Sequence, residues 1–254
     1  MGTSASSKGT PGKAPMVPSW ADTDGQGSGP PPNSGRFRPF RTAMGKAVRG
    51  GGGQGGFRKA LGHYARSATG GAGQGPRRFG AMLASGAALF SAINDLRNGG
   101  TGVSDTGVDL SALNGTDTDR AIQTIIDALV PDNGDADKIR TAMQMALADA
   151  LVGISDFDSS RITDDVLIAM MLAYVRECVF LQVMADSASA FEKAGSANQA
   201  EDAERELHAL VRAVVDQEMR PLFEGDLRTT SRAAIEAVQQ RAVEGVWSEW
   251  EGYE

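Results

Sequence analysis

The residue types that most often carry catalysis are scarce in this chain of 254 residues. Its two histidines, His63 and His208, have neither a second imidazole nor a cysteine at metal-ligand spacing, which a zinc site would require. The single cysteine, Cys178, lies inside an apolar stretch, where a thiol usually packs as a small hydrophobic group and does not react. No Ser-His-Asp or Cys-His arrangement can be built from these positions. We therefore expect no catalytic residues, no metal and no cofactor, and predict that the chain is not an enzyme.

Two glycine patterns have only a superficial similarity to nucleotide-binding loops. Residues 9–14 read GTPGKA, which has the wrong gap for a P-loop and no hydroxyl residue after the lysine. Gly51, Gly53 and Gly56 have the spacing of a dinucleotide-binding fingerprint, but no strand pattern precedes them. Neither pattern predicts a phosphate site.

Two acidic clusters, at 132–137 and 156–158, are similar to the first part of a calcium-binding loop. A calcium loop places a bidentate glutamate at its twelfth position. Counted from the two cluster starts, that position holds Met143 and Leu167. Helix capping therefore explains these aspartates better than calcium binding does.

Charge is divided unevenly along the sequence. Residues 1–100 hold thirteen lysines and arginines against three acidic residues, whereas residues 101–254 hold twelve against twenty-nine. A basic front half and an acidic back half indicate either an anionic partner for the front half or docking of one half on the other.

Cations and aromatic residues alternate between residues 36 and 97. Flexible glycines between them would let cations follow a phosphate backbone while aromatic rings stack on bases. The candidate nucleic-acid contacts are Arg36, Arg38, Arg41, Arg58, Lys59, Arg77 and Arg78. In the competing interpretation, the aromatic residues form the buried face of short helices, and the arginines are solvated or pair with the acidic half. The helical spacing of Phe37, Phe40, Phe57, Tyr64 and Phe79 favours this second interpretation.

Residues 1–35 are dominated by glycine, proline and serine, and we expect a flexible tail because few apolar side chains are present to offset the cost of ordering. The tail has no apolar signal-peptide core, so a cytoplasmic location is expected. Within it, residues 15–20 read PMVPSW, in which Pro18 and Trp20 have the character of a short docking motif. A linker with an incidental tryptophan is an equal alternative.

The first residues read MGTSAS, and the small Gly2 permits removal of Met1. They match an N-acylation pattern, although the alanine-, glycine-, arginine- and aspartate-rich composition is typical of bacteria, where that modification is not expected. A free glycine amine at the start of a flexible tail has the steric access that a modifying enzyme needs.

The elements that must hold these features are all helical, because no stretch alternates with a period of two. The central element is a helix expected over residues 163–191, with Thr163 as its N-cap and two aspartates in its first turn. It is apolar on nearly every face, as buried helices are. It is long enough to span a membrane, but Arg176 and Glu177 at mid-length would be costly in hydrocarbon. We therefore predict an all-α helical bundle around this helix, with no membrane partner.

Apolar residues at helical spacing predict further helices over 77–97, 118–130, 135–151, 199–219 and 226–249. Residues 36–70 are expected to form short helical pieces separated by a flexible break over 50–56. The predicted organisation is a flexible tail over 1–35, a basic glycine-rich region of short helices over 36–100, and an acidic helical domain over 101–254.

Several sequence features resemble the QatB family of bacterial anti-phage proteins. These are the opening Gly2-Thr3-Ser4, the Pro18-x-Trp20 that closes the tail, the run Leu61-Gly62-His63-Tyr64, and the pair Arg77-Arg78 after a glycine-rich break. The resemblance covers about residues 1–85, and beyond them only the all-α character agrees.

Membership of this family implies a subunit of the Qat defence system without catalytic activity of its own. It implies three partners, namely a KAP-type P-loop ATPase, a QueC-like enzyme and a TatD-like nuclease. Because QueC-type enzymes use ATP to couple a 7-deazaguanine carboxylate to an amine, Gly2 is the expected conjugation site, and Thr3, Ser4, Pro18 and Trp20 are the expected recognition residues of the tail. Gly9 or Gly12 would serve if the tail is first trimmed.

Overall fold

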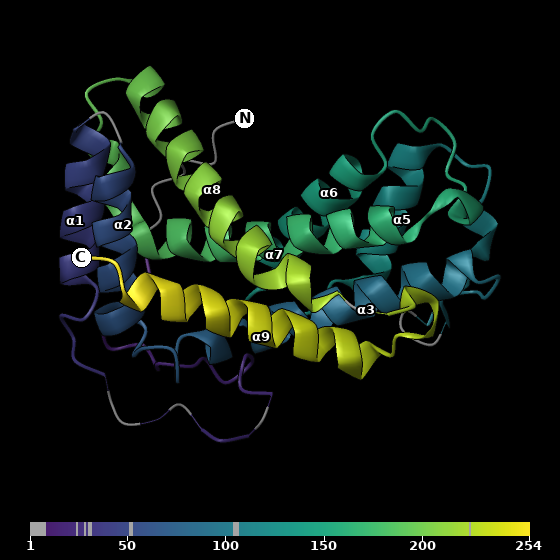
Figure 1. Cartoon of the computed structure of the whole chain (residues 1–254), viewed down its shortest axis with the longest axis horizontal. Coiled ribbons are helices and arrows are strands. Elements are labelled where there is room, and N and C mark those ends of the chain that lie inside the picture. The colour runs from purple at the N-terminus through teal and green to yellow at the C-terminus, as the bar shows by residue number, and fades with distance from the viewer. Residues whose placement is uncertain are drawn as a thin grey trace. The chain divides into compact units, whose positions relative to one another are not determined.

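The computed structural model describes residues 9–23, 25–27, 29, 32–50, 53–103, 107–223 and 225–254. In these residues the regular elements are helices, and the only strand-like pairing is an isolated antiparallel bridge between Asp117 and Asp156. The predicted all-α fold is confirmed (Figure 1).

The α-helices follow one another with short 3-10 or π turns between several of them. Their bounds are α1 Arg38–Arg49, α2 Gln54–His63, α3 Gly80–Arg97, α5 Thr118–Leu129, α6 Ala136–Ala150, α7 Asp164–Ser187, α8 Ala197–Met219 and α9 Arg232–Glu251. A π turn, Tyr64–Ala68, continues α2, and a 3-10 turn, Pro76–Phe79, leads into α3.

The chain divides into two compact units. Unit 1 contains residues 1–80, 179–215 and 243–254, and unit 2 contains residues 81–178 and 216–242. Unit 1 thus holds α1, α2, the end of α7, most of α8 and the end of α9. Unit 2 holds α3, α5, α6, the first part of α7, the end of α8 and the first part of α9.

The core of unit 1 is aromatic. Tyr64 packs against Phe40 and Trp247, with ring centroids 4.8 and 5.8 Å apart, and Trp247 packs against Phe79 at 5.3 Å and Trp250 at 5.2 Å. All five side chains are fully buried. Aromatic pairs at these separations add to the free energy gained by burying their large apolar surface. The two C-terminal tryptophans are therefore core residues of unit 1.

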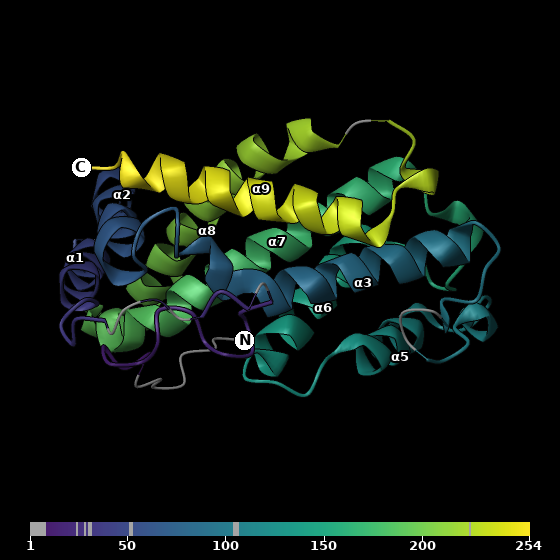
Figure 2. The same cartoon turned by 90° about the horizontal axis from the view of Figure 1, so that it is seen from below.

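Helices α1 and α2 lie side by side in unit 1 in both views (Figure 1 and Figure 2). Phe40, Met44 and Val48 on α1 are fully buried, as their helical spacing predicts. The two helices approach closely where Gly56 meets Ala47, because a Cβ on Gly56 would lie 3.0 Å from the Ala47 methyl group. This contact requires the small residues at both positions.

Unit 2 is held together by polar contacts between buried helices as well as by its apolar core. The Tyr174 hydroxyl on α7 donates to the Met82 carbonyl of α3 at 2.7 Å, and the Gln239 amide on α9 donates to the Leu83 carbonyl at 3.0 Å. Gly86 allows this packing, because a Cβ there would overlap Tyr174 and Gln239. On α5 and α6, the predicted inward residues Ile122, Ile125, Ile126, Ile139, Met143 and Leu147 are buried.

The central helix of the sequence prediction is present as α7, and the Val166 amide donates to the Thr163 hydroxyl at 3.3 Å, which confirms the predicted cap. The helix ends earlier than expected, because Ala188 takes a positive φ of 52° and a 3-10 turn, Ala188–Lys193, follows. The expected break over 50–56 is shorter than predicted, since α2 begins at Gln54. The last helix begins at Arg232 instead of 226, after a separate 3-10 turn, Leu227–Thr229.

Two helical stretches, Pro76–Arg97 and Asp164–Lys193, are long and apolar enough to cross a membrane by length and composition alone. In each, 78% of the most apolar window is buried inside the structure. Burial of this extent is what the core helices of a helical bundle show.

The N-terminal region differs from the flexible tail expected over residues 1–35. Residues 1–8 lie outside the described residues, but residues 9–23 pack against unit 1, where Val17 is 0% and Ala21 1% exposed. Composition alone could not anticipate this packing, because the partners of the segment, among them Arg41 and Arg77, lie elsewhere in the sequence.

Candidate functional site

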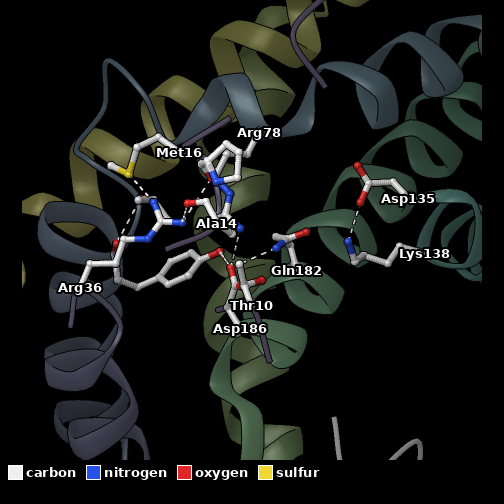
Figure 3. A network of polar contacts seen from close by, with 12 residues as sticks. Thr10, Ala14, Met16, Arg36, Arg78, Asp135, Lys138, Gln182 and Asp186 are labelled. Atoms are coloured by element: carbon white, nitrogen blue, oxygen red, sulfur yellow. Dashed lines mark hydrogen bonds and ion pairs between the residues drawn. The ribbon is translucent and has the colours of Figure 1, made fainter. Parts of the chain in front are cut away.

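The packed N-terminal segment leads to a cluster of buried polar groups centred on Asp186. The Asp186 side chain lies near the end of α7 and is fully buried. Its carboxylate accepts hydrogen bonds from the Tyr64 hydroxyl at 2.8 Å, from the Gln182 amide at 3.0 Å and from the Thr10 hydroxyl. It also pairs with the Arg78 guanidinium at 3.0 Å (Figure 3). These groups satisfy the hydrogen-bonding capacity of a carboxylate that has lost its contact with water.

Local sequence explains why these groups meet. Gln182 and Asp186 are four residues apart, so they share one face of α7. Tyr64 begins the π turn after α2, and Arg78 lies in the 3-10 turn before α3. Two turns and one face of α7 thus direct polar side chains at one point.

The surroundings of the cluster shift the pKa values of two of its groups, Asp186 and Tyr64. Burial raises the pKa of Asp186, but the charge of Arg78 and the hydrogen bonds from Thr10, Gln182 and Tyr64 outweigh it and leave the pKa below its ordinary value. Burial, reinforced by the neighbouring Asp186 carboxylate, raises the pKa of Tyr64 well above its ordinary value. The carboxylate is therefore ionised and the phenol neutral near pH 7.

Two arginines beside this cluster hold the backbone of the N-terminal segment. Arg41 donates to the Thr10 carbonyl at 2.8 Å and to the backbone carbonyl of Asp186 at 2.9 Å. Arg36 donates to the Ala14 and Pro15 carbonyls at 3.0 and 3.3 Å and contacts the Met16 sulfur. Figure 3 shows Arg36 directed at Ala14 and Met16, and Thr10 beside Asp186. Hydrogen bonds from charged donors are stronger than those between neutral groups, so these contacts anchor residues 10–16.

The same arginines surround the ring of Phe37. The guanidinium carbons of Arg36 and Arg41 each lie 4.8 Å from the ring centroid, and that of Arg78 lies 5.9 Å away. Burial lowers the pKa of both Arg36 and Arg41, and neighbouring Arg78 adds to this at Arg36. Both guanidiniums nevertheless stay charged near pH 7, because the ordinary pKa of an arginine lies far above this pH. The ring and the carboxylate together offset the repulsion among the three cations.

The rest of the described N-terminal segment continues along unit 1. Asp22 pairs with Arg77 at 2.6 Å, and Gly80 leaves room for the Ala21 carbonyl where any larger residue would collide with it. Pro18 is partly buried, whereas the Trp20 side chain is 46% exposed. Trp20 therefore offers an aromatic surface at a fixed place on the molecule.

The structure separates the predicted site residues into several groups. Arg36, Arg41 and Arg78 are engaged in the Asp186 cluster, and Arg77 is engaged with Asp22. Of the other candidate cations, Arg58 stacks on Tyr253 with its guanidinium carbon 5.5 Å from the ring centroid, and Arg38 and Lys59 line a pocket between α1 and α2. Gly2, Thr3 and Ser4 lie outside the described residues.

The aromatic residues that would have stacked on nucleic-acid bases are in the core. Phe37, Phe40, Phe57, Tyr64 and Phe79 are each at most 1% exposed. This confirms the competing interpretation for the rings, and the ion pair of Arg78 with Asp186 joins the basic and acidic halves of the sequence as that interpretation allowed.

Asp186 itself was not singled out from the sequence. Its only local signal is an acidic residue in an apolar helix at four residues from Gln182, which places two polar groups on one otherwise apolar face.

The remaining candidates for chemistry are structural. The Cys178 thiol is buried, and this burial raises its pKa, so it stays protonated. His208 packs edge-on to Phe180 with ring centroids 4.8 Å apart. In the described ranges, no group of three or more histidine, cysteine or acidic residues could hold a metal ion.

The two acidic clusters, at 132–137 and 156–158, differ in whether an aspartate side chain caps the element that follows. Asp158 caps a 3-10 turn by accepting from the Ser160 amide at 3.0 Å, as the capping prediction expected. Asp135 stands at the N-cap position of α6 without a side-chain cap bond and pairs with Lys138 at 2.5 Å instead (Figure 3). Capping by the side chain is therefore wrong for Asp135.

A protein-family comparison matches residues 70–249 to the model of "QatB: Qat anti-phage system associated protein QatB". The chain belongs to the QatB family. The matched range includes Arg77 and Arg78, all of unit 2 and less than half of unit 1, whereas most of the motifs noted in the sequence precede it. As a QatB-family protein, the chain is a component of the Qat anti-phage defence system, which has several subunits. Searches of curated proteins and of solved structures found no match.

Proposed function

We propose that this QatB-family chain is a non-enzymatic subunit whose N-terminus is the substrate for conjugation to a 7-deazaguanine-type group by a QueC-like partner. The reaction would take place in the cytoplasm, with the KAP-type P-loop ATPase and the TatD-like nuclease as further partners of the helical body. The observation that supports this proposal best is the anchoring of residues 10–16 by Arg36, Arg41 and Asp186.

An anchored segment next to a modification site has a physical advantage. Gly2 precedes Thr10 by eight residues, so the covalent chain limits its distance from the anchor to about 29 Å. An enzyme that docks on unit 1 would find the amine within this radius. Preorganisation of residues 9–23 also lowers the entropic cost of recognising the segment. The exposed face of Trp20, with Pro18 beside it in sequence, supplies an aromatic recognition point of the kind common in protein interfaces.

The chemistry requires an uncharged amine. Once Met1 is removed, the Gly2 α-amino group has an ordinary pKa of about 8, so a useful fraction is neutral near pH 7.5. The amine attacks the carbonyl carbon of the adenylated carboxylate, the new C–N amide bond forms, and the C–O bond to AMP breaks. The amine loses its proton to solvent, and ATP supplies the energy.

The contacts also rank the alternative acceptors that trimming would create. A terminus at Gly9 keeps the bonds of Thr10 to Arg41 and Asp186. A terminus at Gly12 removes them and loosens the anchor. Gly2 and Gly9 are therefore favoured over Gly12.

The proposal is tested by the intact mass of the chain purified from cells that express the whole operon. We expect a mass increase on the N-terminal peptide, which deletion of residues 2–20 abolishes. Arg41→Gln, which removes the bonds to Thr10, is expected to lower the modified fraction several-fold. Arg49→Gln lies on the same helix with an exposed side chain and is the matched control, which should leave the fraction unchanged. An unmodified N-terminus in a system that still protects cells from phage would end the proposal.

A further inference from the structure

A pocket of about 520 Å³ opens between α1 and α2 in unit 1. Its floor contains Ala47 and Gly56, where the two helices touch, and its walls carry Arg38, Lys46, Lys59 and His63. Ligand pockets for small molecules span roughly 300–1,000 Å³, so the size is sufficient for one.

The pocket is a direct consequence of the helix geometry. Arg38 and Lys46 are eight residues apart on α1, which places them two turns apart on one face. Lys59 and His63 are four residues apart on α2 and share a face in the same way. The small residues at the helix contact bring the two faces together, and the long cationic side chains stand on either side.

The ionisable residues that line the pocket are all basic. Neither Asp nor Glu is among its lining residues. Arg38, Lys46 and Lys59 are exposed, and none of them belongs to an ion pair within the described part of the chain. Burial and the charges of Arg66 and Lys59 lower the pKa of His63. An excess of cations without counter-charges attracts anions to a concave surface.

We propose that this pocket binds the phosphate chain of a nucleoside di- or triphosphate. Three uncompensated cations around an open pocket suit a compact ligand with three or four negative charges, and lysine binds phosphate as a point charge. A polynucleotide is a poorer fit, because the aromatic rings of this region are buried and offer no stacking surface. The inference does not rest on conjugation of the N-terminus.

The test is isothermal titration of the full chain with ADP and, separately, with inorganic pyrophosphate. Both are expected to bind, and a higher affinity for ADP than for pyrophosphate would show that the nucleoside contributes to binding. Lys46→Gln and Lys59→Gln should each weaken binding about tenfold, because each removes one charge-assisted contact. Arg49→Gln removes an exposed charge from α1 outside the pocket and should leave binding unchanged.

Histidine NMR provides an independent readout, because the chain contains only His63 and His208. Ligand binding should raise the pKa of His63, whereas the imidazole signals of His208, which does not line the pocket, should not change. No binding of either probe, or binding that both lysine variants retain in full, would overturn the proposal. Tighter binding of a single-stranded oligonucleotide than of ADP, lost in the same variants, would assign the pocket to nucleic acid and equally overturn it.

Discussion

The carboxylate of Asp186 and the guanidinium of Arg78 form an ion pair at 3.0 Å in which the two side chains are 0% and 4% exposed. A buried pair of this kind holds the structure because neither charge can be left without the other. Thr10 and Tyr64 bond to the same carboxylate, so the pair joins the N-terminal segment, the turn after α2 and the end of α7.

The first prediction concerns the stability of this junction. Asp186→Asn keeps the size of the side chain but leaves the charge of Arg78 without its counter-charge in the interior. We expect it to lower the free energy of unfolding by about 3–5 kcal/mol, as when one partner of a buried ion pair is removed. The measurement is urea denaturation followed by far-UV circular dichroism.

Asp127→Asn is the matched control for this substitution. Asp127 pairs with Arg140 at 2.6 Å, but the two side chains are 57% and 47% exposed. Solvent screens such a pair, so its loss should not measurably change the midpoint. Equal destabilisation by the two substitutions would contradict the assigned role of the buried pair.

The second prediction concerns how the stability of the fold changes at acidic pH. Arg78 and the hydrogen bonds around Asp186 hold its folded-state pKa below the value of about 3.9 expected for an unfolded chain. The unfolded state therefore binds the proton more readily, and the stability that the ionised carboxylate contributes is fully present above about pH 5. It is lost as the pH falls through the folded-state pKa.

The measurement for this prediction is urea denaturation of the wild type and Asp186→Asn between pH 7 and pH 3. The difference in free energy of unfolding between the two proteins should be largest at pH 7 and shrink below pH 4. Other acidic residues titrate in both proteins and cancel in the difference. A difference that stays constant with pH would show that the Asp186 charge is not what stabilises the fold.

Periodicity predicted the helices well because their buried faces are local patterns. Ile122, Ile125 and Ile126 on α5 occupy the core as their spacing requires, and Thr163 caps α7 as its residue type suggests. The ends of helices were less predictable, because the positive φ of Ala188 that ends α7 has no counterpart in residue type.

The Asp186 cluster could not be predicted, because its partners are distant in sequence. Tyr64 and Asp186 are 122 residues apart, and Thr10 and Asp186 are 176 apart. The anchoring of the N-terminal segment could not be predicted from the sequence for a further reason. Several of its contacts are made by backbone carbonyls, which accept from Arg36 and Arg41, and because any residue has a carbonyl, the composition of the segment does not reveal these contacts.

The third prediction concerns the close approach of Gly75 to Trp247. A Cβ on Gly75 would overlap the indole ring of Trp247, which is buried and donates to the Thr69 hydroxyl at 2.8 Å. Gly75→Ala should force the ring or the turn to shift and cost about 1–3 kcal/mol, as overpacked cores do. Urea denaturation gives the free energy, and near-UV circular dichroism reports any displacement of the aromatic core.

Gly73→Ala makes the same chemical change two residues earlier and is the control. Gly73 is exposed, and a Cβ there would meet nothing within 4 Å. Its only effect should be to reduce the freedom of the unfolded chain, which leaves stability unchanged or raises it by up to about 1 kcal/mol. The two substitutions should therefore move the unfolding midpoint in different directions or by clearly different amounts. If Gly75→Ala behaves like Gly73→Ala, the indole of Trp247 does not occupy the space beside Gly75, and the aromatic core of unit 1 is packed differently.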